Sequence, residues 1–211
     1  MTDHLAAWLA VRDSVPWHEV RGSPPGAVVP VRDGPVHDIR VRDHGRDPVR
    51  AARLLGALAC VRADAESGAA LSFPLLSAWQ CRVLDTAEAP FRTLPAFAKG
   101  GRERYGVDPS LRGRFDRCLA QAHEEDLPLP ARAARLHLDV CFFHPFDDGN
   151  ARSAFLALTF LLARAGITLD QVGPVRSVAR RADDPEDALA LAGLLAVLVA
   201  NTARRAVSTR S

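Results

Sequence analysis

Apolar residues follow a helical pattern along most of the chain after Pro48. Alanine and leucine recur at helical spacing in stretches that proline or glycine separates, which is the pattern of amphipathic helices. Ser72, Asp108 and Asp184 stand where N-caps are expected. We therefore expect a mostly α-helical fold, with helices at residues 48–65, 73–84, 109–124, 130–143, 150–165 and 185–206.

Two stretches depart from this helical pattern. Residues 14–47 are rich in proline, glycine, valine and charge, so we predict an irregular extension or a short β-hairpin over residues 1–47, before a main domain over residues 48–211. Residues 89–106 (APFRTLPAFAKGGRERYG) combine alternating aromatic residues and threonine with two glycines. This second stretch predicts a small β-hairpin, or flap.

The size and composition of the chain indicate how many domains it forms and which kinds of partner it binds. A chain of 211 residues, 48% of them hydrophobic, suits one globular domain with at most a modest extension. The formal charge is only +2 and Lys99 is the only lysine, so we expect no nucleic-acid partner. The longest apolar run, residues 188–200, is shorter than the roughly 20 residues that span a bilayer, and the first residues lack a secretory signal pattern. We expect no membrane association.

The cysteines indicate a reducing compartment. They contain no CxxC pair, no histidine cluster lies near them, and each falls in an apolar stretch. We expect four buried free thiols in a cytoplasmic protein, at Cys60, Cys81, Cys118 and Cys141.

Residues 141–152 (CFFHPFDDGNAR) carry the candidate chemistry. Pro145 predicts the end of the preceding helix near His144, because proline disfavours α geometry in the residue before it. A second helix starts five residues later with Asn150 or Gly149 as its cap, and its first free N–H groups face the connecting loop. The N-terminus of a helix favours an anion, so a phosphate group is the expected ligand.

Two carboxylates beside a phosphate require a cation between them. Mg²⁺ takes one or two carboxylates together with phosphate oxygens and water, and Asp148, next to Gly149, is the candidate ligand. Asp147 is interpreted as a helix-capping acid. Arg152 can bind a further phosphate, and His144 is placed to act as a base toward an incoming hydroxyl.

The segment HPFDDGNAR, residues 144–152, closely resembles the signature of the Fic family, H-P-F-x-[D/E]-G-N-[G/K]-R. Seven positions match, and chance agreement at one start is on the order of one in a billion. The resemblance extends over roughly residues 50–165. It includes His137, seven residues upstream, which we interpret as a packing residue, and it implies a possible target-binding flap at Phe91, Arg92 and Thr93.

The resemblance implies an all-α Fic core with a small β flap. It also implies an enzyme that transfers a nucleotide monophosphate, usually AMP from ATP, to a Ser, Thr or Tyr hydroxyl of a target protein with Mg²⁺ as cofactor. In that reaction His144 would be the base, Asp148 would hold Mg²⁺ and Phe146 would anchor the loop. The phosphate groups would bind to Gly149, Asn150, Ala151 and Arg152.

Two positions depart from the adenylylating branch, which has G-N-G-R-x-x-R. This chain has Ala151 for the third residue of that pattern and Phe155 for the second arginine. The residues after Arg152 look more like the Doc branch, some members of which phosphorylate proteins, so a Doc-like kinase and a non-catalytic nucleotide-binding module stay open, as does transfer to a small-molecule hydroxyl. Glu66 lies in the nearest match to the family's inhibitory helix but lacks the flanking pattern, so an external antitoxin partner and the absence of any autoinhibition are both open.

Overall fold

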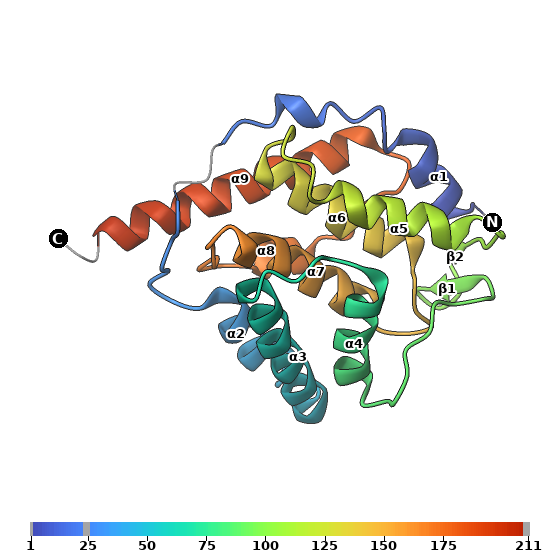
Figure 1. The fold of residues 1–211 in the computed structure, drawn as a ribbon, viewed down its shortest axis with the longest axis horizontal. Coiled ribbons are helices and arrows are strands. Elements are labelled where there is room, and N and C mark those ends of the chain that lie inside the picture. Colours follow the sequence, from blue (N-terminus) through green and yellow to red (C-terminus); the bar gives the residue numbers. More distant parts are fainter. Residues whose placement is uncertain (1, 23–25, 209–211) are drawn as a thin grey trace.

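The computed structural model describes residues 2–22 and 26–208 (Figure 1). Helices form the body of this described part, and one antiparallel hairpin projects from it. The predicted fold class, an all-α core with a small β flap, is confirmed. The main helices are α3 (Pro48–Glu66), α4 (Phe73–Leu84), α5 (Leu111–Gln121), α6 (Leu129–Phe143), α7 (Asn150–Arg164) and α9 (Pro185–Ser208).

The predicted helix limits hold to within two residues except in α5, which is shorter at both ends. The Ser72 hydroxyl accepts the N–H of Leu75, and the Asp184 carboxylate accepts two N–H groups of the first turn of α9, so both act as N-caps. The prediction for Asp108 is wrong. Its carboxylate accepts from the N–H and hydroxyl of Ser110, and Ser110 takes the N-cap position.

The described residues before α3 contain short helices rather than a β-hairpin, so that part of the prediction is wrong. They form α1 (His4–Val11), a 3₁₀ turn at Trp17–Glu19, α2 (Gly34–Asp38) and a π-helical turn at Ile39–Asp43. Side-chain caps begin two of these helices: Asp3 accepts two N–H groups of α1, and Asp33 accepts one of α2. Caps of this kind stabilise helices too short to show a hydrophobic period.

Helix α6 is the centre of the fold and contacts α1, α5, α7 and α9. Nearly all of its side chains are buried, including Leu136, Val140 and Phe143. Figure 1 shows α1 and the hairpin at one end of the long axis and the C-terminal end of α9 at the other. Because His144 follows directly on α6, the core fixes the position of the first motif residue.

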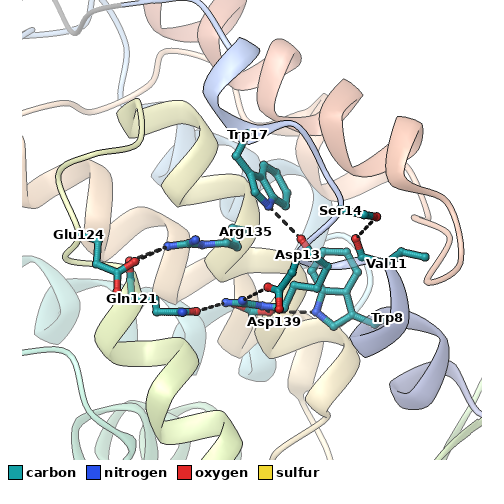
Figure 2. Close-up of polar contacts among 10 residues, drawn as sticks. Trp8, Val11, Asp13, Ser14, Trp17, Gln121, Glu124, Arg135 and Asp139 are labelled. Atoms are coloured by element: carbon teal, nitrogen blue, oxygen red, sulfur yellow. Dashed lines mark hydrogen bonds and ion pairs between the residues drawn. The ribbon is translucent and has the colours of Figure 1, made fainter.

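A buried ion pair joins α1 to α6 (Figure 2). The Asp139 carboxylate, fully buried on α6, accepts from the indole N–H of Trp8 at 2.9 Å and from Nε and Nη2 of Arg12 at 2.7 and 2.8 Å. The remaining donors of Arg12 bind Gln121 and Asp13. The residues that donate hydrogen bonds to Asp139, Trp8 and Arg12, therefore both come from the segment before residue 14.

Helix α9 is 24 residues long, longer than the apolar run that predicted it. Within the described ranges it is the one helix long and apolar enough to cross a membrane, by length and composition alone. Core helices of soluble proteins pass the same test, and α9 packs along α6 with Leu191, Ala192 and Leu195 buried. Its length is therefore weak evidence for a membrane span.

The predicted flap is present as strands β1 (Ala96–Ala98) and β2 (Glu103–Tyr105), which pair antiparallel. The N-terminal segment binds strand β2 of this hairpin and the residue that follows it. The Asp3 carboxylate accepts from Nη1 of Arg104 at 2.8 Å and from the N–H of Gly106 at 3.0 Å. Helix α1 thus contacts both the flap and α6, the two elements that flank the motif.

Candidate functional site

A cavity of about 620 Å³ lies against the motif loop. The hairpin contributes Phe97 and Tyr105 to its lining, and the segment from Val175 to Arg180 contributes another part. The cavity brings together six of the predicted site residues: His144, Asp148, Gly149, Asn150, Ala151 and Arg152. Phe146, Phe91, Arg92 and Thr93 do not line it.

His144 is the C-cap of α6, with a left-handed backbone (φ 50°). Its Nδ1 lies 2.8 Å from the carbonyl oxygen of Cys141, which can only accept a hydrogen bond, so Nδ1 carries the proton and Nε2 carries a lone pair. The imidazole stacks on the Tyr105 ring at 4.0 Å. Burial lowers the pKa of His144 below its ordinary value, so the ring is a neutral base at neutral pH.

Phe146 is the buried anchor that the sequence predicts. Its side chain is 1% exposed and stacks on Phe73, with the ring centroids 5.4 Å apart. The Asn150 amide closes the loop around it, because Oδ1 accepts the N–H of Phe146 at 2.9 Å and Nδ2 donates to its carbonyl at 2.7 Å. The Asn150 side chain is therefore hydrogen-bonded within the loop. Its backbone N–H lies at the start of α7.

Gly149 is the N-cap of α7, and a larger residue would be strained at this position. Its φ of 78° lies in the left-handed region, and a Cβ would lie 2.5 Å from Nε2 of Gln80. That amide nitrogen donates to the carbonyl oxygen of Asp148 at 2.5 Å. Gln80 was not predicted as a site residue, although it is a polar residue on an otherwise apolar helix face.

Asp148 lies between two guanidinium groups. Its Oδ2 is 3.2 Å from Nη2 of Arg152 and 3.6 Å from Nη2 of Arg50, and its side chain is 68% exposed. Burial, and next to it the charge of Arg50, lowers the pKa of Arg152. Asp147 is exposed and does not occupy the N-cap position, which Gly149 takes, so its interpretation as the helix cap is wrong.

The described residues contain no group of three or more His, Cys, Asp or Glu side chains that could hold a metal ion. Asp148 alone is one exposed carboxylate with hard oxygen donors. Such a donor fits Mg²⁺, which takes one or two carboxylates and completes its shell with phosphate oxygens and water. One carboxylate is enough for a Mg²⁺ ion that binds together with a phosphate ligand. Asp148 is the residue that would hold this ion.

Arg92 links the motif loop to the flap and is 4% exposed. Its guanidinium donates to the carbonyl oxygens of four residues, and its N–H donates to Pro145. The Arg92 guanidinium therefore has no exposed donor for a target, and target binding by the flap stays a prediction. Phe91 is half-buried against Phe73, and Thr93 is exposed. The four acceptors of Arg92 are Phe143, His144, Leu94 and Gly106.

His137 is buried on α6, one turn before Cys141, as a packing residue would be. Its Nε2 lies 3.7 Å from the Cys141 sulfur, and burial lowers its pKa to about 4. It is therefore neutral. The four cysteines are free thiols, but Cys118 alone is fully buried, and the other three are half-buried.

Phe155 is 1% exposed and packs in the core beneath the cavity. The guanidinium of Arg176 lies over its ring, 4.7 Å from the centroid. Arg176 belongs to α8 (Gly173–Ser177), a short helix that the sequence pattern did not predict, and it pairs with Asp38 at 2.5 Å and Asp43 at 2.7 Å. The Arg176 guanidinium therefore lies near position 155, but it is paired with the carboxylates of Asp38 and Asp43.

The fold is a helical core with a motif loop between α6 and α7, a hairpin beside this loop and a histidine, His144, at the end of α6. Residues 89–162 match the model of the Fic/DOC family, and this segment holds the motif loop. The comparison with curated proteins found no match.

Two solved structures show the same fold. One is a Fic-domain-containing signaling protein from Bacteroides thetaiotaomicron, 17% identical, with a TM-score of 0.58 over 75% of this chain and 70% of the other. The second is a Fic family protein from Desulfovibrio desulfuricans G20, 17% identical, with a TM-score of 0.56 over 98% of this chain. The chain spans 64% of the length of that second protein.

Proposed function

We propose that this protein transfers a nucleoside monophosphate, AMP from ATP, to a Ser, Thr or Tyr hydroxyl of a target protein. The supporting observation is the tautomer of His144, because the bond from Nδ1 to the Cys141 carbonyl leaves a lone pair at Nε2. The target oxygen forms a bond to the α-phosphorus, and the bond from that phosphorus to the bridging oxygen breaks. Nε2 takes the hydroxyl proton, and pyrophosphate leaves.

The other motif residues position the phosphate groups. Arg152 and the first N–H groups of α7 supply positive charge and donors on one side of the loop. Mg²⁺, held by Asp148, would neutralise phosphate charge when bound. Transfer of a phosphoryl group depends mainly on such positioning and charge neutralisation, so a single base and a cationic loop suffice.

A lysate labelling experiment tests the proposal. The protein, Mg²⁺ and ATP labelled separately at the α and γ phosphates are incubated with candidate targets. We expect the α label on a protein product, no label with His144→Ala, and full label with the control His18→Ala, an exposed histidine away from the cavity. Retained transfer in His144→Ala would exclude His144 as the base.

A Doc-like kinase is the second candidate, because Phe155 removes the second motif arginine and is buried. In that case the γ label, and not the α label, appears on the target. A non-catalytic nucleotide-binding module gives nucleotide binding with no covalent label on any protein. The same experiment therefore separates all three functions.

The proposed setting is the cytoplasm, where free thiols stay reduced. The proposed partner is a protein with an accessible hydroxyl side chain, and an antitoxin protein is a further possible partner. Neither a nucleic acid nor a membrane is part of the proposal.

A further inference from the structure

Five cationic side chains line the cavity in the described part of the chain. Three of them, Lys99, Arg176 and Arg180, each have a carboxylate oxygen at 2.7 Å or less. Arg50 and Arg152 differ, because they share one carboxylate, that of Asp148, at the longer distances of 3.6 and 3.2 Å. Of the five cations, these two arginines therefore have the weakest ion pairs within the protein.

Arg50 comes from outside the motif and outside the segment that the family model matches. It lies in the first turn of α3, where the Asp47 carboxylate accepts its backbone N–H at 3.0 Å. Helix α3 packs on α7, so the cap and the packing together fix where this first turn lies. The Arg50 side chain is 51% exposed and reaches the cavity beside Asp148.

The contact between Arg50 and Asp148 is weak enough to be exchanged. Both side chains are more than half exposed, and ion pairs of this kind contribute little in water. A phosphate oxygen is a better partner for a guanidinium, because it accepts charge-assisted hydrogen bonds in a planar, bidentate arrangement. If Asp148 held a metal ion, both guanidinium groups could bind phosphate oxygens in place of the carboxylate.

We propose that Arg50 is the second phosphate-binding cation of this site, in place of the arginine that position 155 lacks, and that the site prefers nucleoside di- and triphosphates to monophosphates. The inference rests on the proposed function. Arg152 and the N-terminus of α7 can satisfy one phosphate group. A second or third phosphate group supplies the additional oxygens that Arg50 binds.

The test is calorimetric titration of the full chain with ATP, ADP and AMP in Mg²⁺. We expect Arg50→Ala to weaken ATP and ADP binding roughly tenfold or more and AMP binding by less than about twofold. The control is Arg53→Ala on the same helix, because Arg53 pairs with Asp85 at 2.7 Å and does not line the cavity. Its affinities should stay within about twofold of the wild type, and Arg50→Lys should recover part of the loss.

Two outcomes overturn the inference and are distinguishable. If the wild type binds ATP and Arg50→Ala binds it equally well, Arg50 has no phosphate role, whereas the proposed function stands. If the wild type binds none of the three nucleotides, both the proposed function and this inference fail. Thermal unfolding of each variant confirms that a loss of affinity does not arise from a loss of fold.

Discussion

Phe155 lies in the core and also beneath a guanidinium, which makes it a sensitive position for substitution. Phe155→Arg would restore the arginine of the adenylylating pattern, but it would place a second cation beside Arg176 and remove a buried ring. We expect a loss of about 3 kcal/mol or more in the free energy of unfolding, with no gain in ATP affinity. Urea unfolding and calorimetric titration with ATP and ADP measure the two effects.

Phe155→Leu is the matched control, because it keeps an apolar side chain and should cost less than about 1.5 kcal/mol. Tighter ATP binding by Phe155→Arg with unchanged stability would mean that position 155 faces the phosphates, as in the adenylylating branch. That result would also remove the reason for assigning the second cation to Arg50.

The pH dependence of transfer reports on His144. Burial lowers its pKa below the ordinary value of 6.5, so the neutral, active form of the base persists to lower pH than a free histidine would allow. As the pH falls, kcat/KM should decline with a midpoint below 6.5. A profile of kcat/KM between pH 4 and 8 measures this midpoint, and a value above 6.5 would show that a nearby negative charge, and not burial, dominates.

The link between α1 and α6 depends on one buried ion pair, Arg12 with Asp139. Arg12→Ala leaves the Asp139 carboxylate buried with only the Trp8 indole as a partner, and we expect a loss of about 3–5 kcal/mol in the free energy of unfolding. Asp13→Ala is the control. The Asp13 side chain is 89% exposed, so its loss should cost less than about 1 kcal/mol.

A double variant separates the two causes of that loss. Arg12→Met with Asp139→Leu removes both charges while it keeps apolar volume, and such replacements are often neutral or stabilising. If the double variant is as unstable as Arg12→Ala, the packing of α1 matters more than the unpaired carboxylate. Urea unfolding of all the variants gives the comparison.

The hairpin is the element best placed to bind an extended target segment. Strand β1 has β2 as its partner on one side, and Leu94 and Phe97 are 72% and 57% exposed. If the target adds a strand to this edge, Phe97→Pro should reduce protein modification more than nucleotide binding, because it removes a backbone N–H. Phe97→Ala, which keeps the N–H, is the control. Equal losses of modification and nucleotide binding in Phe97→Pro would show that the segment is only structural.

For the whole molecule, the sequence predicts the elements better than their polar connections. The helices that carry the core were predicted because apolar residues repeat over several turns, and Ser72 and Asp184 mark two of their starts. The motif residues His144, Asp148 and Arg152 were predicted as site residues from their order in one short segment, and the structure brings them to one cavity. Hydrophobic periodicity and local spacing therefore suffice for the core and for the loop.

Contacts between distant segments could not be predicted in this way. Gln80, Arg92 and Arg50 reach the motif from α4, the flap and α3, and each contact depends on how these elements pack. The short α8 and the helices before residue 47 have too few turns for a hydrophobic period to show. The buried pair of Arg12 and Asp139 joins residues 127 apart in the sequence, and a charged residue gives no sign of burial by itself.

This packing leads to a prediction about the boundary at residue 48, which the sequence placed between an extension and the main domain. Trp8, Trp17 and Ile39 are nearly or fully buried in the same core cluster as α6. Removing one large core side chain costs about 3–5 kcal/mol, and the whole stability of a domain is about 5–15 kcal/mol. We therefore expect residues 48–211 alone to lose cooperative thermal unfolding, measured by circular dichroism, whereas Asp13→Ala in the full chain keeps it. If residues 48–211 unfold cooperatively near the midpoint of the full chain, the first 47 residues are a separable extension.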